Sequence, residues 1–549
     1  MAEISDEQYS DKQNYFQNLK LGFFPSDNIS IPDYLKIIDY KRLVLPNYQN
    51  TSTAVTLRGV ISGEKEFTDI PLAFTDVVIA DVIAGLGALF VSDTGLGKTQ
   101  LLKDICRYLF GGDGPGGNAN MVVGRKDFQI EDLLTITEAD LTTGVYNSRE
   151  SRRIDPARAR RVFYGVNEIN RASHAVQNDF IDLAEGERNF NGIDFALGQN
   201  GYTVFMATAN LNNTNGDFEG IYSFDRALMN RANMTFDLDH INFTPTPMDE
   251  LDIEERKFST KLDLAPIEDK TYELLLMNQH IRGLTATSDP NHAAFRFLVG
   301  RAMNYCPTDK YGDKKALFPT KCTTKCTNRE KLCAMLKPAS TRTLTAVKSM
   351  AYALHYVAEL KLGRRFHVDI FDAALQAFKF TTYHGNLNEI LVEEKYDFRK
   401  QMMMDDVITK LTSATNLARK YISVVLDGND SVVTITFAHP KDERNGEVVT
   451  TAKSDSLIES LEALKASGKL PGGYTENNIE RELTGMGVGV DWMPAFAERF
   501  KNWKPKVLPS DETMDKSAPE TSSEIPYDEP ADNSNPETLA SEISDVIEG

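Results

Sequence analysis

Eight consecutive residues in the first third of the chain have the types and spacing that bind phosphate groups. They follow a short apolar run, Ala88 to Val91, and precede an amphipathic stretch, which predicts a strand, a loop and a helix. Such a loop points backbone N–H groups and a helix N-terminus at one place, and Gly95 and Gly97 allow a close approach. Lys98 would reach the β- and γ-phosphates of a nucleotide, and the Thr99 hydroxyl would bind Mg²⁺. The eight residues are Ser92, Asp93, Thr94, Gly95, Leu96, Gly97, Lys98 and Thr99.

The loop departs from the usual phosphate-binding pattern at its first position. Ser92 stands where that pattern has Gly, and Ser is small enough to be a mild change. A chance Gly-Lys-Thr turn is the alternative, and the strand before it and the helix after it argue against that reading.

A second apolar run, Val162 to Val166, ends in residues suited to hydrolysis. Phosphate-loop ATPases carry an Asp at this strand end, which holds Mg²⁺ through water, and then a Glu that orients the attacking water. Here Asn167 occupies the Asp position and Glu168 follows it. The Asn167 amide oxygen accepts a hydrogen bond from a metal-bound water but adds no negative charge. We therefore expect Glu168 to act as the base. Because of Asn167, we expect weaker Mg²⁺ binding or slower turnover than in ATPases that carry an Asp at this position.

The motif Glu168-Ile-Asn-Arg-Ala172 gives the sequence a specific resemblance to one protein family. The chain resembles the MoxR-type ATPases of the AAA+ superfamily, and the resemblance covers roughly residues 60 to 390. The phrase Glu185-Gly-Glu-Arg188 and a predicted hairpin around Asn191-Gly192 follow, and in the family that hairpin faces the pore of a ring or a partner. The resemblance implies a homo-hexameric ring that uses ATP and Mg²⁺.

The resemblance also implies roles for residues further along the chain. Asn210, at the end of a predicted strand, is similar to the sensor that positions the water or the γ-phosphate. The segment Phe224 to Arg231 resembles the family's Leu-Asp-Arg-Phe words, and it would supply an arginine to the neighbouring subunit. Arg226 is favoured for this role and Arg231 is the alternate. For either residue the alternative is a purely structural role, in which the arginine forms a salt bridge at a helix end. Arg342, in a turn that resembles Ser-Pro-Arg with Thr341 in place of Pro, would lie over the nucleotide as a second sensor.

The apolar pattern predicts an α/β fold whose core is a parallel five-stranded sheet with flanking helices. The strand candidates are Ala88 to Val91, Met121 to Val123, Val162 to Val166, Tyr202 to Ala207 and Met234 to Leu238. Helical stretches follow near Ile267 to Ile281, Ala293 to Met303, Thr341 to Leu362 and Val368 to Phe380. We expect an N-terminal extension at 1–60, an AAA+ ATP-binding core at 61–245 and an α-helical lid with a Cys-rich insert at 246–390. We then expect a small α+β appendage at 391–506, which contains a β-prone run at 431–437 and a helix at 454–467. The last expected part is a disordered acidic tail at 507–549.

The charge balance restricts the partners. The net charge is −20, which repels a phosphate backbone and argues against broad nucleic-acid binding. Residues 511–549 hold twelve Asp or Glu and one Lys, a net charge of −11; within them, Leu539 to Ile547 could form a docking helix, although a solubilising tail is the simpler reading. The sequence shows neither a long apolar run nor the pattern of a secretory signal, so we expect no membrane span and a cytoplasmic location.

Two clusters have uses that the sequence leaves open. Cys306, Cys322, Cys326 and Cys333 fall within one short lid segment, and four thiolates suit Zn²⁺ or an iron–sulfur cluster. Reduced cysteines without a metal are the alternative, since no Cys-x-x-Cys turn is present; Cys106 is expected in the core. A run of arginines precedes the predicted strand Val162 to Val166, and it would contact nucleic acid, an acidic partner or a neighbouring subunit. Its members are Arg149, Arg152, Arg153, Arg158, Arg160 and Arg161.

Three functions fit these patterns. The first is an ATPase motor that remodels a protein client during complex assembly or cofactor insertion, with a von Willebrand A domain protein as a separate partner, as the resemblance implies. The second is a nucleic-acid-dependent motor, which the arginine run would serve. The third is a nucleotide-gated structural protein in which Asn167 weakens hydrolysis.

Overall fold

The computed structural model describes the larger part of the chain. The described residues are 39–48, 50–61, 67–92, 95–126, 128, 134–137, 152–154, 156–190, 193–210, 226–256, 264–286, 289–304, 330–427 and 476–500. The β-prone run at 431–437, the expected helix at 454–467 and the acidic tail lie outside these ranges.

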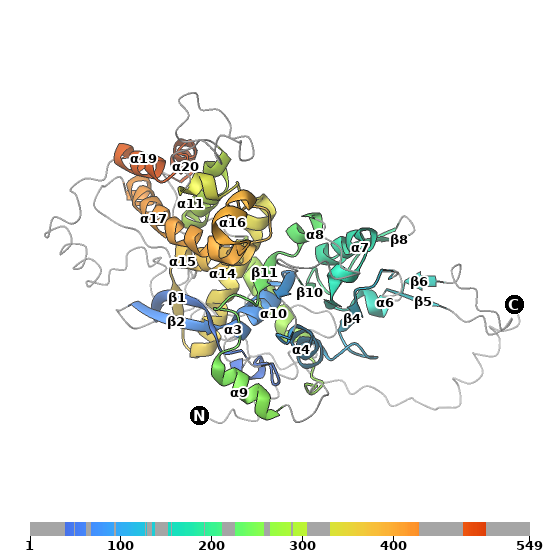
Figure 1. Cartoon of the computed structure of the whole chain (residues 1–549). Coiled ribbons are helices and arrows are strands. Elements are labelled where there is room, and N and C mark those ends of the chain that lie inside the picture. The colour runs from blue at the N-terminus through green and yellow to red at the C-terminus, as the bar shows by residue number, and fades with distance from the viewer. Residues whose placement is uncertain are drawn as a thin grey trace, which may run out of the picture.

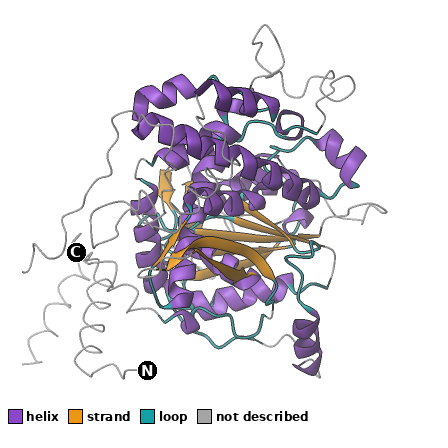
Figure 2. Ribbon diagram, turned by 90° about the vertical axis from the view of Figure 1, so that its left-hand side faces the viewer, coloured by secondary structure: helices purple, strands orange, loops and turns teal. Residues whose placement is uncertain are grey.

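A five-stranded parallel sheet forms the centre of the molecule, and helices enclose it (Figures 1 and 2). Along the sheet the strands follow the order β11-β3-β10-β7-β4, and every neighbouring pair is parallel. The α/β class and all five predicted strands are confirmed. The strands are β3 (Ala88–Ser92), β4 (Ala119–Val123), β7 (Phe163–Asn167), β10 (Val204–Asn210) and β11 (Met234–Asp237).

Alternate side chains of each central strand enter different hydrophobic clusters because successive residues of a strand point to opposite faces. Ala88 and Phe90 of β3 belong to the larger cluster, whereas Leu89 and Val91 belong to the smaller one. The larger cluster includes α3 (Phe74–Ala84), α4 (Lys98–Asp104) and the π-helical turn η2 (Ile105–Leu109). The smaller one includes α7 (His174–Glu185) and α8 (Arg226–Arg231). Both faces of the sheet are thus covered, as continuous apolar strands require.

A second sheet joins segments that lie far apart in the sequence. Strands β1 (Thr53–Ile61) and β2 (Phe67–Ala73) form an antiparallel pair, and β12 (Phe366–Val368) pairs with β1. β1 therefore crosses residue 60, where we expected an extension to end and the core to begin. The preceding segment, with η1 (Tyr40–Arg42), packs Leu43, Leu45 and Tyr48 into the larger cluster.

Two small hairpins complete the strands. β5 (Thr135–Thr137) pairs with β6 (Arg152–Ile154), shortly before α6 (Pro156–Ala159). β8 (Glu187–Phe190) pairs with β9 (Ile193–Ala196), and Phe190 lies opposite Ile193. The hairpin predicted around Asn191-Gly192 is therefore present, and its two turn residues lie outside the described part.

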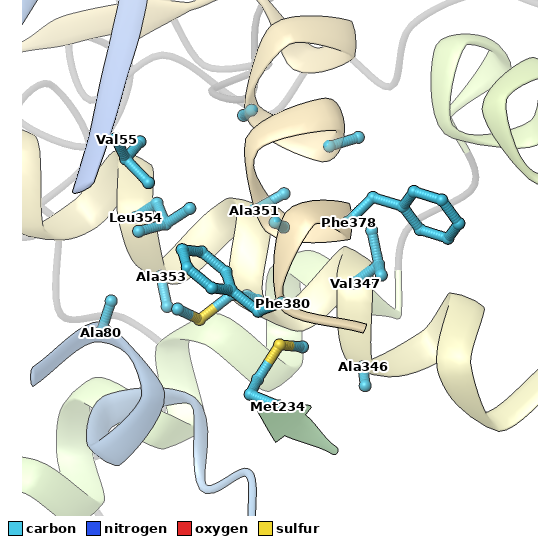
Figure 3. Packing of buried hydrophobic residues seen from close by; sticks show 14 of the residues in the cluster. Val55, Ala80, Met234, Ala346, Val347, Ala351, Ala353, Leu354, Phe378 and Phe380 are labelled. Carbon is cyan, nitrogen blue, oxygen red and sulfur yellow. The ribbon is translucent and has the colours of Figure 1, made fainter. Parts of the chain in front are cut away.

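Helices make up the described residues beyond β11. The predicted helix at 341–362 is confirmed as α14, which packs on α3 and on α15; Figure 3 shows Ala351, Phe380 and Met234 in this core. Within 391–427 and 476–500, the described parts of the expected appendage, all regular structure is helical. The helices and helical turns not yet given are η3 (Ile169–Arg171), α9 (Pro247–Arg256), α10 (Thr271–Thr285), α11 (Pro290–Val299), η4 (Arg301–Asn304), α13 (Leu332–Met335), α14 (Thr341–Leu362), α15 (Ile370–Phe378), η5 (Lys379–Thr381), α16 (Glu389–Tyr396), α17 (Lys400–Asp427), α19 (Glu476–Gly485) and α20 (Met493–Phe500).

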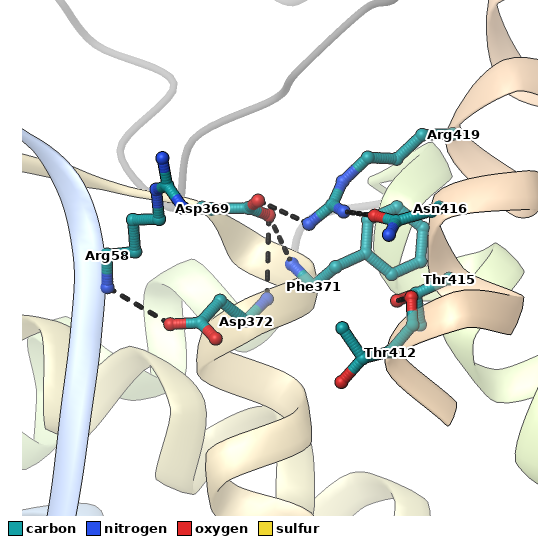
Figure 4. Close-up of polar contacts among 8 residues, drawn as sticks. All are labelled: Arg58, Asp369, Phe371, Asp372, Thr412, Thr415, Asn416 and Arg419. Atoms are coloured by element: carbon teal, nitrogen blue, oxygen red, sulfur yellow. Dashed lines mark hydrogen bonds and ion pairs between the residues drawn. The ribbon is translucent and has the colours of Figure 1, made fainter. Parts of the chain in front are cut away.

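One polar junction ties the second sheet to the helices (Figure 4). The Asp369 carboxylate caps α15 by accepting from the backbone N–H of Phe371, and it also accepts from Arg419 of α17. Asp372 accepts from the backbone N–H of Arg58 in β1, at 3.0 Å. Caps of this kind typically stabilise a helix by about 1 kcal/mol. This cap also fixes the place of α17.

Asp81 makes stability depend on pH. Its carboxylate is buried on α3, and no hydrogen-bond partner for either oxygen is found among the described residues. Burial raises the pKa of Asp81 to about 8, from 3.8. Because the folded chain then holds this proton more tightly than the unfolded chain, stability falls as pH rises from about 4 to 8, by at most about 1.4 kcal/mol per pH unit.

We expect Asp81→Asn to remove this slope. Urea unfolding between pH 5 and 8 checks it, with Asp252→Asn, an exposed position on α9, as the matched control. An Asp81→Asn variant that loses stability with pH as steeply as the wild type would contradict the expectation.

Candidate functional site

The phosphate-loop residues stand at the carboxyl end of β3, where the sheet order places three strand ends together. β10 lies between β3 and β7, so the ends at Ser92, Asn210 and Asn167 are neighbours. The next strand in sequence, β4, lies on the far side of β7, and β11 lies on the other side of β3. Open α/β sheets bind ligands outside the carboxyl ends of their strands where the strand order reverses.

The described part of the loop has the backbone that phosphate binding needs. Gly95 and Gly97 have positive φ angles of 98° and 74°, which residues with a Cβ rarely adopt. Gly97 is the N-cap of α4, so the helix starts at Lys98 and its N-terminus faces the loop. Asp93 and Thr94 lie outside the described residues.

Lys98 is held at the loop by Ser92. The residue is 7% exposed, and its Nζ donates to the backbone oxygen of Ser92 at 2.9 Å and to Ser92 Oγ at 2.6 Å. The serine in place of the usual glycine thus supplies a hydroxyl acceptor that glycine lacks. These two bonds place the Lys98 ammonium beside the loop.

A chain of hydrogen bonds connects α4, the helix that follows the loop, to the end of β7. Thr99 Oγ1 and Thr208 Oγ1 both donate to Asn167 Oδ1, each at 2.9 Å. The backbone N–H of Glu168 donates to Thr208 Oγ1 at 2.8 Å. The two residues expected to hold Mg²⁺, Thr99 and Asn167, are therefore in direct contact.

Glu168 occupies a strained backbone position beside these groups. Its φ of 56° is left-handed, which is uncommon for a residue with a Cβ, and such outliers concentrate at functional sites. Gly124 permits it, since a Cβ on Gly124 would lie 2.3 Å from the Glu168 backbone oxygen. The Glu168 carboxylate pairs with Arg171 at 2.9 Å, and the Glu168 side chain is 26% exposed.

Asn210 lies at the end of β10, opposite Ser92 in the register. Its backbone oxygen accepts from Asn170 Nδ2 at 2.7 Å, which links it to the turn after Glu168. Among the predicted site residues described by the structure, Ser92, Lys98, Thr99, Asn167, Glu168 and Asn210 converge on one edge of the sheet.

Arg231 and Arg342 lie at the opposite edge of the sheet. Arg231 Nε forms an ion pair with Glu185 Oε1 at 2.8 Å, and Arg342 Nη2 donates to the same oxygen at 2.6 Å. Arg231 ends α8, just before β11 begins, and Met234 pairs with Ala88 at the start of β3. The loop follows the other end of β3, about 13 Å away at roughly 3.3 Å per residue.

The expectation for Arg342 is a position over the nucleotide. In this structure Arg342 pairs with Glu185, and its role as a second sensor stays a prediction. The last turn of α14, at Lys361, pairs with Asp76 at the start of α3, and α14 has 22 residues against 11 in α3, so its first turn extends beyond α3. Arg226 begins α8, and its side chain is not described.

Three residues that the sequence analysis did not select belong to these sites. Tyr48 is buried with its ring 3.3 Å from the Cβ position of Gly97, so it packs directly on the loop. Thr208 links Asn167 to Glu168, and Glu185 holds two arginines. Thr208 could have been noticed as a polar residue within the apolar strand before Asn210. Glu185 belongs to the Glu-Gly-Glu-Arg motif, and the sequence around Tyr48 holds no comparable signal.

The metal proposal for the cysteines gains no support. Cys333 is buried in α13, close to Gly487, whereas Cys306, Cys322 and Cys326 lie outside the described residues. Within the described ranges, no group of three or more His, Cys, Asp or Glu could hold a metal ion. Cys106 is buried as expected, and burial raises the pKa of its thiol to about 12.

The arginine run is partly a structural feature. Arg161 donates to the backbone oxygens of Asp113, Gly114 and Ala119 and to the side chain of Asn120. It thereby fixes the glycine-rich loop before β4.

Comparisons with known proteins do not assign the chain to a family. No family model matches the sequence, and no curated protein matches it. Among solved structures, the chain is similar to the crystal structure of a putative ATPase from Cytophaga hutchinsonii ATCC 33406, at 2.00 Å resolution. The TM-score is 0.44 at 15% sequence identity, and the match covers 73% of this chain and 97% of that one. In the part of the chain that the structure describes, no helix is both long and apolar enough to cross a membrane.

Proposed function

We propose that this chain hydrolyses ATP as a ring-forming AAA+ motor of the MoxR type. The observation that carries the proposal is the contact between Thr99 and Asn167, which unites the loop helix with the strand that presents Glu168. A phosphate loop alone would support nucleotide binding. The addition of a carboxylate at the neighbouring strand end supports hydrolysis.

The side chains present suit Mg²⁺ bound with ATP. Thr99 Oγ1 donates its proton to Asn167, so its lone pairs face away from that bond and remain available as an oxygen ligand. Asn167 Oδ1 already accepts two hydroxyl donors and would share a metal-bound water only by releasing one of them. Bound Mg²⁺ would neutralise charge on the transferred phosphate. Lys98 would exchange its bonds to Ser92 for phosphate oxygens, and Glu168 would orient the attacking water.

The arginines at the opposite edge support assembly into a ring. Arg231 and Arg342 pair with Glu185 of their own chain, away from the carboxyl end of β3 where the loop begins. A neighbouring subunit that placed its own loop against this edge would bring Arg226, Arg231 and Arg342 near a foreign phosphate. Each site in a homo-hexamer would then combine residues of two subunits.

The energy of hydrolysis would be used on a protein client. The two hairpins, β5–β6 and β8–β9, are the small strand pairs that such a motor would present to a client or to a separate partner with a von Willebrand A domain. The net charge of −20 and the use of Arg161 within the fold weigh against a nucleic-acid substrate. DNA-stimulated turnover would reverse that preference.

Asn167 favours one alternative, a nucleotide-gated structural protein with weak hydrolysis. The residue lies where a metal-holding Asp is expected, and its amide adds no charge there. Phosphate release from ATP, measured together with the oligomer size with and without nucleotide, separates the two functions. The motor releases phosphate repeatedly and assembles with ATP, whereas the structural protein binds ATP tightly and releases almost none.

A further inference from the structure

A groove with arginines at its rim lies among the helices, separate from the nucleotide site. Its volume is about 620 Å³, and it is lined by parts of α11, η4, the start of α14 and the end of α20. Phe297, Leu344 and Phe500 supply apolar surface, and Arg296, Arg301 and Arg499 are exposed beside it.

The groove is preformed and carries positive charge that the fold leaves available. Phe297 stacks on Trp492 at a centroid distance of 5.6 Å, which fixes one wall. Arg301 pairs with Asp491 at 2.8 Å, whereas no ion pair of Arg296 or Arg499 is found in the described ranges. The N-terminus of α14, at Thr341, also opens here and favours negative charge. An apolar floor with a cationic rim fits an acidic amphipathic helix.

We propose that the acidic C-terminal segment of this chain, residues 535–549, binds in this groove. The segment has the required pattern: Leu539, Ile543 and Val546 fall on one side of a helix, with Glu542 and Asp545 beside them. Asn535 followed by Pro536 is a typical helix start.

The covalent connection makes this segment the favoured occupant. Phe500 lines the groove, and 38 residues separate it from Leu539. A random coil of that length reaches roughly 35 Å, which gives a millimolar-range local concentration without any partner. Residues 511–549 also carry a net charge of −11, complementary to the arginines.

A bound segment would lie next to the proposed intersubunit arginines. Thr341 lines the groove, and Arg342 follows it in the first turn of α14, where it pairs with Glu185. Binding of the segment in the groove does not require ATP hydrolysis, because only residues of the groove and of the segment take part.

Peptide binding to the full-length chain tests the proposal. A variant with Leu539→Ser, Ile543→Ser and Val546→Ser leaves the groove open, and a fluorescent peptide of residues 535–549 is titrated with it at low ionic strength. We expect saturable binding, followed by fluorescence anisotropy. The wild-type chain should bind the peptide at least about ten-fold more weakly, because its own segment competes.

Charge reversal locates the binding site. Adding Arg296→Glu and Arg499→Glu to the open variant should weaken peptide binding about ten-fold or more, whereas Arg481→Glu, an exposed position on α19 outside the groove, should not. Thermal unfolding verifies that each variant is folded. Absence of peptide binding, equal binding by the wild-type chain and the open variant, or indifference to the reversal would each overturn the proposal.

Discussion

Glu168→Gln should lower ATP turnover by about 10²–10⁴-fold while leaving ATP affinity nearly unchanged. The glutamine keeps the shape of the side chain but cannot accept a proton from water. Its backbone N–H still donates to Thr208 Oγ1, so the strand end and the Thr99–Asn167 contact should remain in place. Phosphate release and equilibrium binding of ATP, measured on the same preparation, separate the two quantities.

A matched substitution far from the site provides the control. Glu250→Gln changes an exposed glutamate on α9 in the same way and should leave turnover unaltered. If Glu168→Gln turned over ATP within about two-fold of the wild type, the role of general base would be wrong.

Arg226→Ala should reduce turnover about 10³-fold or more and should be rescued in mixed assemblies. We propose that Arg226 completes the site of the neighbouring subunit, because Arg231 is already bound to Glu185 within its own chain. A ring that mixes Arg226→Ala with Glu168→Gln subunits contains some interfaces with an intact Glu168 on one side and an intact Arg226 on the other. Those interfaces should restore turnover, although each variant alone is inactive.

Arg231→Ala is the comparison for this experiment. Its ion pair joins α8 to the end of α7, and the side chain is 23% exposed, so its loss should lower thermal stability more than turnover. Rescue of Arg231→Ala by Glu168→Gln, without rescue of Arg226→Ala, would transfer the intersubunit role to Arg231. Absence of rescue for both would contradict a shared site.

Local patterns were enough to predict the five-stranded sheet and the meeting of the proposed site residues at one end of its strands. The strand candidates are short apolar runs, and a strand followed by Gly95-Leu-Gly-Lys98 has few other structural outcomes. The carboxyl ends of parallel strands meet at one edge, so Lys98, Thr99, Asn167 and Glu168 had to converge once the strands were assigned.

Long-range packing determined what local patterns did not show. Arg342 contacts Glu185, 157 residues earlier in the chain, and the last turn of the same helix pairs with Asp76 of α3, more than 250 residues earlier. The pairing of β12 with β1 joins segments about 300 residues apart, so the expected boundary at residue 60 fell inside a strand. The bond from Lys98 to Ser92 Oγ could not be inferred from the smallness of serine alone.

The most direct test of the nucleotide site is equilibrium binding of a fluorescent ATP analogue to the full-length chain with Mg²⁺. The account predicts that Lys98→Ala weakens binding about 10–100-fold, the effect of losing a charge-assisted contact, and that Lys103→Ala on the same helix does not. Unchanged affinity after Lys98→Ala would contradict the account, since residues 95–99 would then not be where the chain holds phosphate.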